Sequence, residues 1–547
     1  MKIDTDFDDR RKLEQSYENI SPFEFKNELI ALAQENQKKS ARVMLNAGRG
    51  NPNWIAATPR DAFFTLGHFA VAESRLVVNH GDLAGKPAIE GVAGRLREYL
   101  QTHPNAPGAT LLGQIVDYGV NVKKFDPDAF VHELVDGIIG DNYPVPDRML
   151  THTEQVVHDY ILQEMCQNDA SVGHFHLFAV EGATAAMCYI FDCLRENYLL
   201  ERGDRVAIMV PIFPPYVEIP RLARYNFDVV EIRADAVDEH GDHTWQYPDA
   251  ELDKLADPSI KALFLVNPSN PPSVAMVSES VSHLIKTVKE KNPNLMIISD
   301  DVYGTFVDGY RSLMADLPHH TIGVYSFSKY FGVTGWRLGV IAVHEDNVFD
   351  RLLKELPQDQ REVLRHRYSS LSQHPEQIRF IDRIVADSRQ VALNHTAGLS
   401  TVQQVQMAIF CAFALLDKDN LYKQQTKDIC HKRMMMLYDG LGMPYPNLPH
   451  DADYYTEFDL AHWAKTHYGE SFAHYLQTNY EPVDILFRLA SQSSIVLLNG
   501  GGFHGPKWSI RVSLANLDDE AYSQIGRELH RALDEYVNSW RQSDAKV

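Results

Sequence analysis

One lysine lies just past the end of a short apolar run, in the stretch SFSKYFGVTGWRLG. Lys329 follows the run TIGVYSF, with Ser326 three places before it and Arg337 eight places after it. An ammonium group next to a buried strand costs free energy unless it is paired or used chemically. The spacing therefore marks Lys329 as a residue whose amine has a chemical role, beside hydroxyl and guanidinium groups.

Other apolar runs are also followed by residues that could bind a ligand. These residues are Gly182, Ala183 and Thr184 after HFHLFAV, Phe213 after RVAIMVP, Asn270 after ALFLV, and Asp300 and Tyr303 after NLMIIS. Small residues and a hydroxyl at a helix N-terminus can bind phosphate. Each signal alone is typical of a cap, a turn or a core residue. Five such signals in this order indicate one site.

The elements that position these residues follow from the alternation along the chain. From about residue 170, short apolar runs rich in β-branched residues alternate with longer amphipathic stretches. This alternation predicts an α/β fold with a parallel sheet between helices. Ligands of such sheets collect at the carboxyl ends of the strands. We therefore expect the residues that follow the runs to meet at one edge of the sheet.

Composition excludes several classes of function. The 547 residues carry a net charge of −22, which argues against a nucleic-acid partner. The five cysteines are scattered, so neither a disulfide framework nor a metal site is predicted. The polar start of the chain does not resemble a signal peptide, and no apolar run is long enough to span a membrane. We expect a cytoplasmic protein that contacts neither nucleic acid nor membrane.

Taken together, these motifs resemble the aspartate-aminotransferase-like, fold type I enzymes that use pyridoxal 5′-phosphate. The resemblance covers roughly residues 45–540, and its most specific parts are the Lys–Arg segment and the Asp-x-x-Tyr motif. It implies a large domain with a mostly parallel sheet between helices, plus a smaller α+β domain built from both chain ends. We expect an arm over 1–45, small-domain residues with an insertion over 46–140, a large cofactor-binding domain over 141–390, and the rest of the small domain over 391–547.

The resemblance also implies roles for the cofactor-binding residues. Lys329 would bond covalently to the aldehyde carbon of the cofactor. Asp300 would pair with the pyridine nitrogen, Asn270 and Tyr303 would bond the ring oxygen, and Phe213 would stack on the ring. The phosphate would be held by Gly182, Ala183, Thr184, Ser326, Ser328 and Arg337. Tyr143, about 40 residues before the phosphate turn, would reach the phosphate of a neighbouring subunit.

Two arginines are the expected substrate contacts. Arg511 in WSIRVSLAN matches the family's C-terminal arginine, which binds the α-carboxylate of the substrate. Arg49 in the NAGRGNP loop is the candidate for a second, distal carboxylate. Arg361, Arg365 and Arg367 are alternatives, because ordinary aminotransferases take this arginine from a neighbouring subunit shortly after the lysine segment.

The sequence departs from the family pattern in three respects. The common Asn-Pro-Thr-Gly segment reads Asn270-Pro271-Pro272-Ser273 here, so the chain after that strand is expected to be capped differently. Glu181 precedes the phosphate turn, which is an unusual place for an anion, and we expect its side chain to point away. The chain is also over 100 residues longer than a typical aminotransferase.

The length of the chain and its motifs GRGNPNW and SFSKYFGVTGWRLG resemble those of the aspartate 4-decarboxylases, a long-chain branch of this family. That resemblance implies conversion of L-aspartate to L-alanine and carbon dioxide, with aspartate transamination as a side activity. The alternative is an aspartate- or alanine-type aminotransferase without decarboxylase activity. A regulator with an aminotransferase-like domain would need a basic DNA-binding module, for which residues 1–45 are too short. The resemblance further implies a homo-oligomer built from dimers, with larger symmetric assemblies of those dimers.

Overall fold

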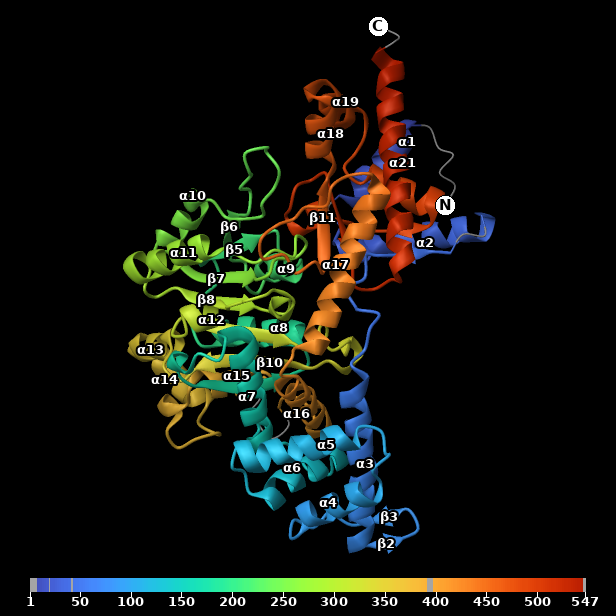
Figure 1. The fold of residues 1–547 in the computed structure, drawn as a ribbon. Helices are drawn as coiled ribbons and strands as arrows, with labels where there is room; N and C mark the ends of the chain where they lie inside the picture. The colour runs from blue at the N-terminus through green and yellow to red at the C-terminus, as the bar shows by residue number, and fades with distance from the viewer. Residues whose placement is uncertain (1–6, 19, 41–42, 391–396, 545–547) are drawn as a thin grey trace.

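The computed structural model describes residues 7–18, 20–40, 43–390 and 397–544. Parts of the expected N-terminal arm, and the residues that follow the expected boundary at 390, lie outside these ranges. A central seven-stranded sheet lies between a helical extension, α3 to α6, and a second body that carries both chain ends (Figure 1). The site residues have to be placed within this frame.

The central sheet is mostly parallel, as the sequence predicts. Its strands are β4 (Phe175–Val180), β5 (Arg205–Val210), β6 (Asp228–Arg233), β7 (Ile260–Val266), β8 (Met296–Asp300), β9 (Thr321–Ser326) and β10 (Gly339–His344). They lie in the order β4-β10-β9-β8-β7-β5-β6, and β10 is antiparallel to both of its neighbours. The edge strand β6 escaped the sequence analysis because three of its six residues are half-buried in succession and it has no continuous apolar run.

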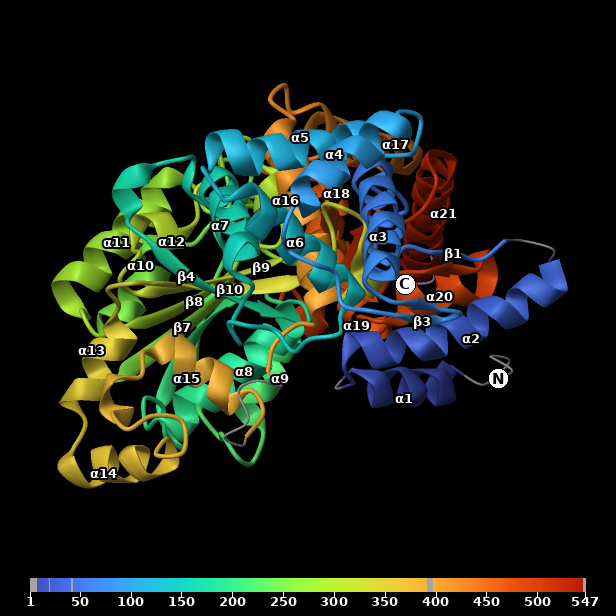
Figure 2. The same ribbon diagram turned by 90° about the horizontal axis from the view of Figure 1, so that it is seen from below.

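Helices cover both faces of this sheet, which explains the apolar strands. α7 (Thr151–Cys166) and α12 (Leu313–Asp316) lie on one face, and α8 (Ala183–Glu196) and α15 (Phe380–Asp387) lie on the other (Figure 2). All six residues of β9 and of β10 are buried. A strand that is buried on both faces reads as an unbroken apolar run.

The long N-terminal insertion packs with the large core. It comprises α3 (Ala57–Val77), β2 (Asn79–His80), β3 (Leu83–Ala84), α4 (Val92–Thr102), α5 (Ala109–Asp117) and α6 (Pro127–Ile139). Together with α16 (Thr401–Leu416), its apolar residues join the buried cluster that includes the sheet. The remaining helices around the sheet are α9 (Pro215–Arg221), α10 (Asp249–Leu252), α11 (Ser278–Lys291), α13 (Val348–Glu355) and α14 (Gln358–Arg367).

A second buried cluster joins the two ends of the chain. Its helices are α1 (Phe7–Tyr17), α2 (Pro22–Ser40), α17 (Leu421–Leu441), α18 (Leu460–Tyr468), α19 (Glu470–Asn479), α20 (Asp484–Arg488) and α21 (Asp519–Asp544). Its strands are β11 (Tyr455–Asp459), β13 (Leu498–Asn499) and β14 (Ser509–Ser513), with β1 (Leu45–Asn46) paired in parallel to β12 (Ile495–Val496). Residues far apart in the sequence therefore form one wall beside the sheet (Figure 1).

Three general features accompany this architecture. All five cysteines are free thiols; Cys188 is exposed and the other four are buried. Among the described residues, no helix is both long and apolar enough to cross a bilayer. The predicted domain boundaries stay predictions, since α3 to α6 share a core with the sheet rather than with the second cluster.

Candidate active site

A cavity of about 150 Å³ opens at the carboxyl ends of the central strands, where the sequence predicts the site. Eleven predicted residues line it: Ala183, Thr184, Phe213, Asn270, Asp300, Tyr303, Ser326, Ser328, Lys329, Arg337 and Arg511. They come from the last residues of β8 and β9, from the segments that follow β4, β5, β7, β8 and β9, and from β14. Strand ends far apart in the sequence thus converge as the parallel-sheet rule requires.

The lysine lies where β9 ends and a tight turn begins. Its side chain is half-buried, and its Nζ donates a hydrogen bond to the carbonyl oxygen of Gly50, 3.0 Å away. No carboxylate is hydrogen-bonded or ion-paired to Lys329 among the residues that the structure covers. The amine is therefore held by one neutral acceptor inside the cavity, an arrangement that leaves it available as a nucleophile.

Asp300 at the end of β8 is a buried carboxylate with one oxygen left unsatisfied. Its Oδ2 accepts a hydrogen bond from the hydroxyl of Tyr216 at 3.3 Å, while its Oδ1 is buried and has no partner. Burial, followed by the neighbouring charge of Asp301, raises the pKa of Asp300 to about 7. A cationic N–H donor in the cavity would satisfy the free oxygen and favour the charged carboxylate.

An anion cradle forms at the other end of the cavity. Gly182 has a φ of +86°, and a Cβ there would lie 2.7 Å from Nη2 of Arg337. The Arg337 guanidinium is partly exposed and donates to backbone oxygens of Thr334 and Glu181. The N-terminus of α8 and the Ser326 hydroxyl, 3.0 Å from that of Ser328, complete the cradle. Such a combination of helix N-terminus, arginine and hydroxyls binds phosphate.

The unusual anion before the phosphate turn does not face the cradle. Glu181 accepts a hydrogen bond from the hydroxyl of Tyr189 at 3.0 Å and lies 3.6 Å from the guanidinium of Arg389. Only its backbone oxygen contacts Arg337. Its negative charge is thus paired outside the site.

Arg511 is a fully buried cation without an acidic partner in the cavity. Its guanidinium donates to Oδ1 of Asn270 and to the carbonyl oxygen of Gly48, both at 3.0 Å, and its Nε has no partner. It stacks over the rings of Tyr455 and Phe503 at 4.3 and 4.9 Å. Burial lowers the pKa of Arg511. A buried guanidinium with two neutral acceptors is suited to receive a carboxylate from a ligand.

The segment Asn270-Pro271-Pro272-Ser273, which stands in place of the common Asn-Pro-Thr-Gly, is held by a hydrogen bond to its last residue. Ser273 has a φ of +67°, and its Oγ accepts a hydrogen bond from the backbone nitrogen of Tyr455 at 3.0 Å. This contact ties the loop after β7 to the start of β11. In the same loop, the amide oxygen of Asn270 accepts its hydrogen bond from Arg511.

Six residues that line the cavity were not predicted from the sequence: Phe23, Gly50, Val266, Val302, Thr334 and Tyr455. Phe23 comes from α2, and Lys26 of the same helix does not line the cavity. Phe23 packs edge-on against Phe213, with ring centroids 5.8 Å apart. Burial, then the charges of Arg49 and Arg511, lowers the pKa of Lys26. The first 45 residues looked like a surface helix, and nothing in their own pattern indicates that they cover a cavity.

Three predicted residues lie outside the cavity lining: Gly182, which forms part of the anion cradle, Arg49 and Tyr143. Arg49 is exposed, and its charge, after burial, contributes to lowering the pKa of Lys26. Tyr143 is 64% exposed in the loop before α7, so within one chain it does not reach the phosphate cradle. Its expected contact with a neighbouring subunit stays a prediction.

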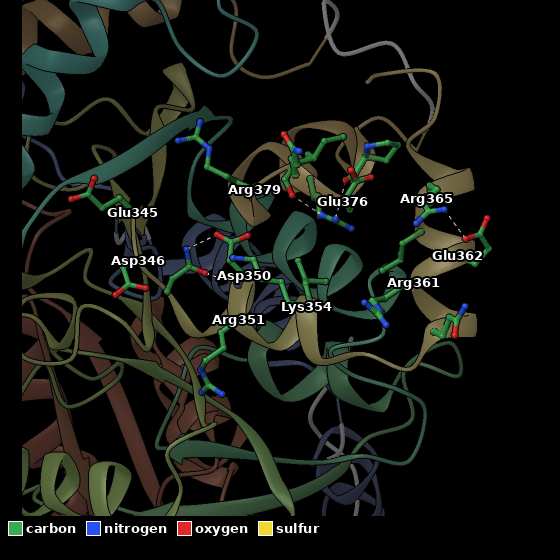
Figure 3. A pocket seen from close by; sticks show the side chains of 18 residues that line it. Glu345, Asp346, Asp350, Arg351, Lys354, Arg361, Glu362, Arg365, Glu376 and Arg379 are labelled. Atoms are coloured by element: carbon green, nitrogen blue, oxygen red, sulfur yellow. Dashed lines mark hydrogen bonds and ion pairs between the residues drawn. The ribbon is translucent and has the colours of Figure 1, made fainter. Parts of the chain in front are cut away.

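The alternative arginines are also remote from Lys329 in this chain. Arg361 and Arg365 line a separate, open pocket of about 950 Å³ between α13, α14 and α15 (Figure 3). Arg365 pairs there with Glu362 at 3.2 Å, whereas Arg367 bridges Glu196 and Asp387.

Comparison with known proteins identifies the group to which this constellation belongs. Residues 175–528 match the family model described as aminotransferase class I and II. The chain belongs to the class I and II aminotransferase family. Its enzymes use pyridoxal phosphate, and so does this one. The free Asp300 oxygen, the anion cradle and the unpaired lysine amine fit that cofactor's pyridine nitrogen, phosphate and aldehyde.

Individual relatives place the chain within this family. A bifunctional aspartate aminotransferase and L-aspartate beta-decarboxylase of Pseudomonas sp. is 50% identical over 96% of this chain and 98% of its own length. Aspartate aminotransferase of Pinus pinaster is 32% identical over 26% of this chain and 28% of its own length. The structure of Thermus thermophilus aspartate aminotransferase with maleate aligns at a TM-score of 0.57 and 16% identity, covering 93% of this chain and 96% of that one. The last similarity confirms the fold type I architecture.

Proposed function

We propose that this chain converts L-aspartate to L-alanine and carbon dioxide by β-decarboxylation and transaminates aspartate as a side reaction. The observation that carries the proposal is the extent of similarity. The bifunctional relative matches at 50% identity over nearly the whole chain, including the insertion, whereas an ordinary aspartate aminotransferase matches over about a quarter of it. A dicarboxylic amino acid also suits a cavity with a buried arginine, whose charge acts together with that of Arg49 on nearby Lys26.

The residues that would hold the cofactor follow from the geometry. Lys329 would bind it covalently, Asp300 would face its ring nitrogen, and Phe213 would lie against the ring. The predicted phosphate contacts are the backbone of Gly182 and Ala183 with the side chains of Thr184, Ser326, Ser328 and Arg337. Asn270 and Tyr303 would form hydrogen bonds with the ring oxygen of the cofactor. When bound, pyridoxal phosphate supplies an electron sink for bonds broken at the substrate carbons.

The protein groups around this sink would orient the substrate. Arg511 would bind the α-carboxylate through its two Nη groups, which fixes which bonds of the α-carbon face the cavity. Lys329, once released by the incoming amine, would take the proton from the α-carbon and return protons later as a general acid and base. The cluster of aromatic side chains around it would exclude water and so disfavour hydrolytic release of a 2-oxo acid.

The distal carboxylate is proposed to face the cavity mouth. Arg49, the proposed contact, is exposed, so its contact with a carboxylate is weakened by solvent. A loosely held carboxylate suits a group that has to leave as carbon dioxide. Replacing Arg49 by alanine should raise the KM for aspartate. The KM for alanine should not change, because alanine has no distal carboxylate. An equal effect on both would exclude this role.

Product analysis tests the proposed reaction directly. Purified holoenzyme is incubated with aspartate and no 2-oxo acid, and alanine, carbon dioxide and oxaloacetate are counted per subunit. Decarboxylation gives many equivalents of alanine and carbon dioxide. An aminotransferase without decarboxylase activity stops after about one equivalent, because nothing removes the amino group that it has taken up. That outcome would refute the proposal.

The assembly and location of the enzyme are also proposed. A homo-oligomer built from dimers would place Tyr143 of one subunit beside the phosphate cradle of the next, and its exposure is consistent with that role. Cytoplasmic location follows only from the sequence expectation. Analytical ultracentrifugation of the holoenzyme, with Tyr143→Phe as a cofactor-affinity test, would examine the dimeric arrangement.

A further inference from the structure

Two tyrosine hydroxyls meet beside the cofactor site. Tyr303 and Tyr455 are 3% and 2% exposed, and their hydroxyl oxygens lie 3.0 Å apart. The rings are edge to face, with centroids 5.4 Å apart. Tyr303 is an expected ligand of the cofactor, but no role for Tyr455 follows from the motifs of the sequence. Both side chains line the cavity.

The hydroxyl of Tyr455 is held in place from several sides. The backbone nitrogen of Tyr455 donates to Ser273 Oγ, and the Arg511 guanidinium lies over the Tyr455 ring. On the opposite side, a methyl group at Gly50 would collide with the Tyr455 hydroxyl and would lie 3.1 Å from Nζ of Lys329. The hydroxyl therefore occupies a narrow space between Tyr303 and the backbone that receives the lysine amine.

Each hydroxyl has one hydrogen, so only one of the two tyrosines donates in the bond between them. If Tyr303 donated to Tyr455, its hydrogen would point away from the ring oxygen of a bound cofactor. If Tyr455 donates, Tyr303 keeps its hydrogen for that oxygen and becomes a stronger donor, because hydrogen bonds in a chain polarise one another. The second arrangement gives each of the two hydroxyl hydrogens an acceptor when the cofactor is bound.

We propose that Tyr455 is a positioning residue that donates its hydroxyl hydrogen to Tyr303 and thereby directs the Tyr303 hydrogen to the cofactor. Through this pair of hydroxyls, Tyr455 lowers the affinity of Lys329 Nζ for its proton in the holoenzyme. The inference rests on cofactor binding at Lys329 and not on which amino acid is the substrate. Its test is accordingly separate from the product analysis.

The readout is the pH midpoint of the visible absorbance change of the holoenzyme without substrate. Tyr455→Phe removes the donated hydrogen bond and should raise the midpoint by about 0.3 pH unit, a twofold change in proton affinity. Tyr303→Phe removes the direct bond to the cofactor and should raise it by about 1 unit. Gly50→Ala, which displaces the Tyr455 hydroxyl, should also raise the midpoint.

The double variant distinguishes coupling from a general disturbance. In the Tyr303→Phe background, Tyr455→Phe should produce no further shift, because its effect is transmitted through the Tyr303 hydroxyl. Tyr438→Phe is the matched control: its buried hydroxyl lies 3.0 Å from Thr456 Oγ1, next to Tyr455 in the chain, and does not line the cavity. It should leave the midpoint unchanged.

Three results would overturn the proposal. A midpoint that falls in Tyr455→Phe would mean that Tyr303 is the donor of the pair. An unchanged midpoint would mean that the pair does not affect the proton at Lys329. A shift that persists at full size in the Tyr303→Phe background would mean that Tyr455 acts on the site by another route.

Discussion

The floor of the cavity and its cover are built in different ways. The floor consists of residues that directly follow β4, β5, β7, β8 and β9, and their positions are set by one buried sheet. The cover consists of Phe23 from α2, Gly50, and Tyr455 from β11, which are far apart in the sequence. The difference indicates that the bond-making groups lie at the ends of the strands of one sheet, while the groups that admit substrate and exclude water come from separate parts of the sequence.

The strongest test of the floor is removal of its amine. Lys329→Ala should reduce turnover of aspartate by at least about a thousandfold, because the covalent partner and the general base are lost together. The holoenzyme should also lose the covalent cofactor–peptide bond that borohydride reduction fixes in the wild type. Lys354→Ala, an exposed lysine on α13, is the control and should retain activity. Reductive labelling of a different lysine would show that Lys329 does not carry the cofactor.

The second test concerns Arg511. Its buried guanidinium donates to Asn270, a residue of the floor, and to Gly48, two residues before Gly50 of the cover. Arg511→Lys retains the charge but not the planar pair of donors that now contacts Asn270 and Gly48. The KM for aspartate should rise by roughly 10- to 100-fold, which corresponds to about 1.4–2.8 kcal/mol. Steady-state kinetics at saturating cofactor measure this change. Wild-type kinetics in the variant would exclude Arg511 as the α-carboxylate ligand.

The third test uses the pH dependence of the floor itself. The pKa of Asp300 is raised to about 7, mainly by burial, so the folded protein favours the protonated carboxyl. Its contribution to stability is present below pH 4 and is lost as the pH rises through 7. In the apoenzyme, Asp300→Asn should therefore gain thermal stability relative to the wild type between pH 5 and pH 8, by a few kcal/mol at most.

Calorimetry of both apoenzymes across that pH range gives the comparison. Asp308→Asn, which replaces a largely exposed carboxylate, should show no such pH-dependent gain. A difference between wild type and Asp300→Asn that stays constant with pH would contradict the raised pKa.

The smallest expected effect belongs to the cover. Phe23→Ala removes the ring that packs on Phe213, and water should then enter more readily. The share of turnovers that end in a 2-oxo acid should rise by about threefold to tenfold relative to decarboxylation, equivalent to about 1 kcal/mol between the two barriers. Phe23→Leu should restore most of the wild-type ratio. An unchanged ratio in Phe23→Ala would mean that the cover does not control water access.

The same division explains what could be predicted from the sequence. Lys329, Asp300 and Asn270 were found because each follows an apolar run, and parallel strands bring their carboxyl ends to one edge. Phe23 and Lys26 gave no such signal, because an amphipathic helix shows which face is buried but not what it covers. Tyr455 is the first residue of the short strand β11, and its hydrogen-bond partner Tyr303 lies 152 residues away in the sequence. Its role depends on a register that local pattern does not specify.

The parallel pairing of Leu45 with Ile495 has a consequence for how the enzyme is made. The lysine and its phosphate cradle can form as soon as the central sheet is synthesised. The wall that encloses them needs residues from the beginning of the chain and residues from near its end. During synthesis, the N-terminal helices therefore have to wait for a partner that emerges several hundred residues later, and closure of so long a loop slows folding. An enclosed cofactor site should accordingly be among the last parts of the molecule to mature.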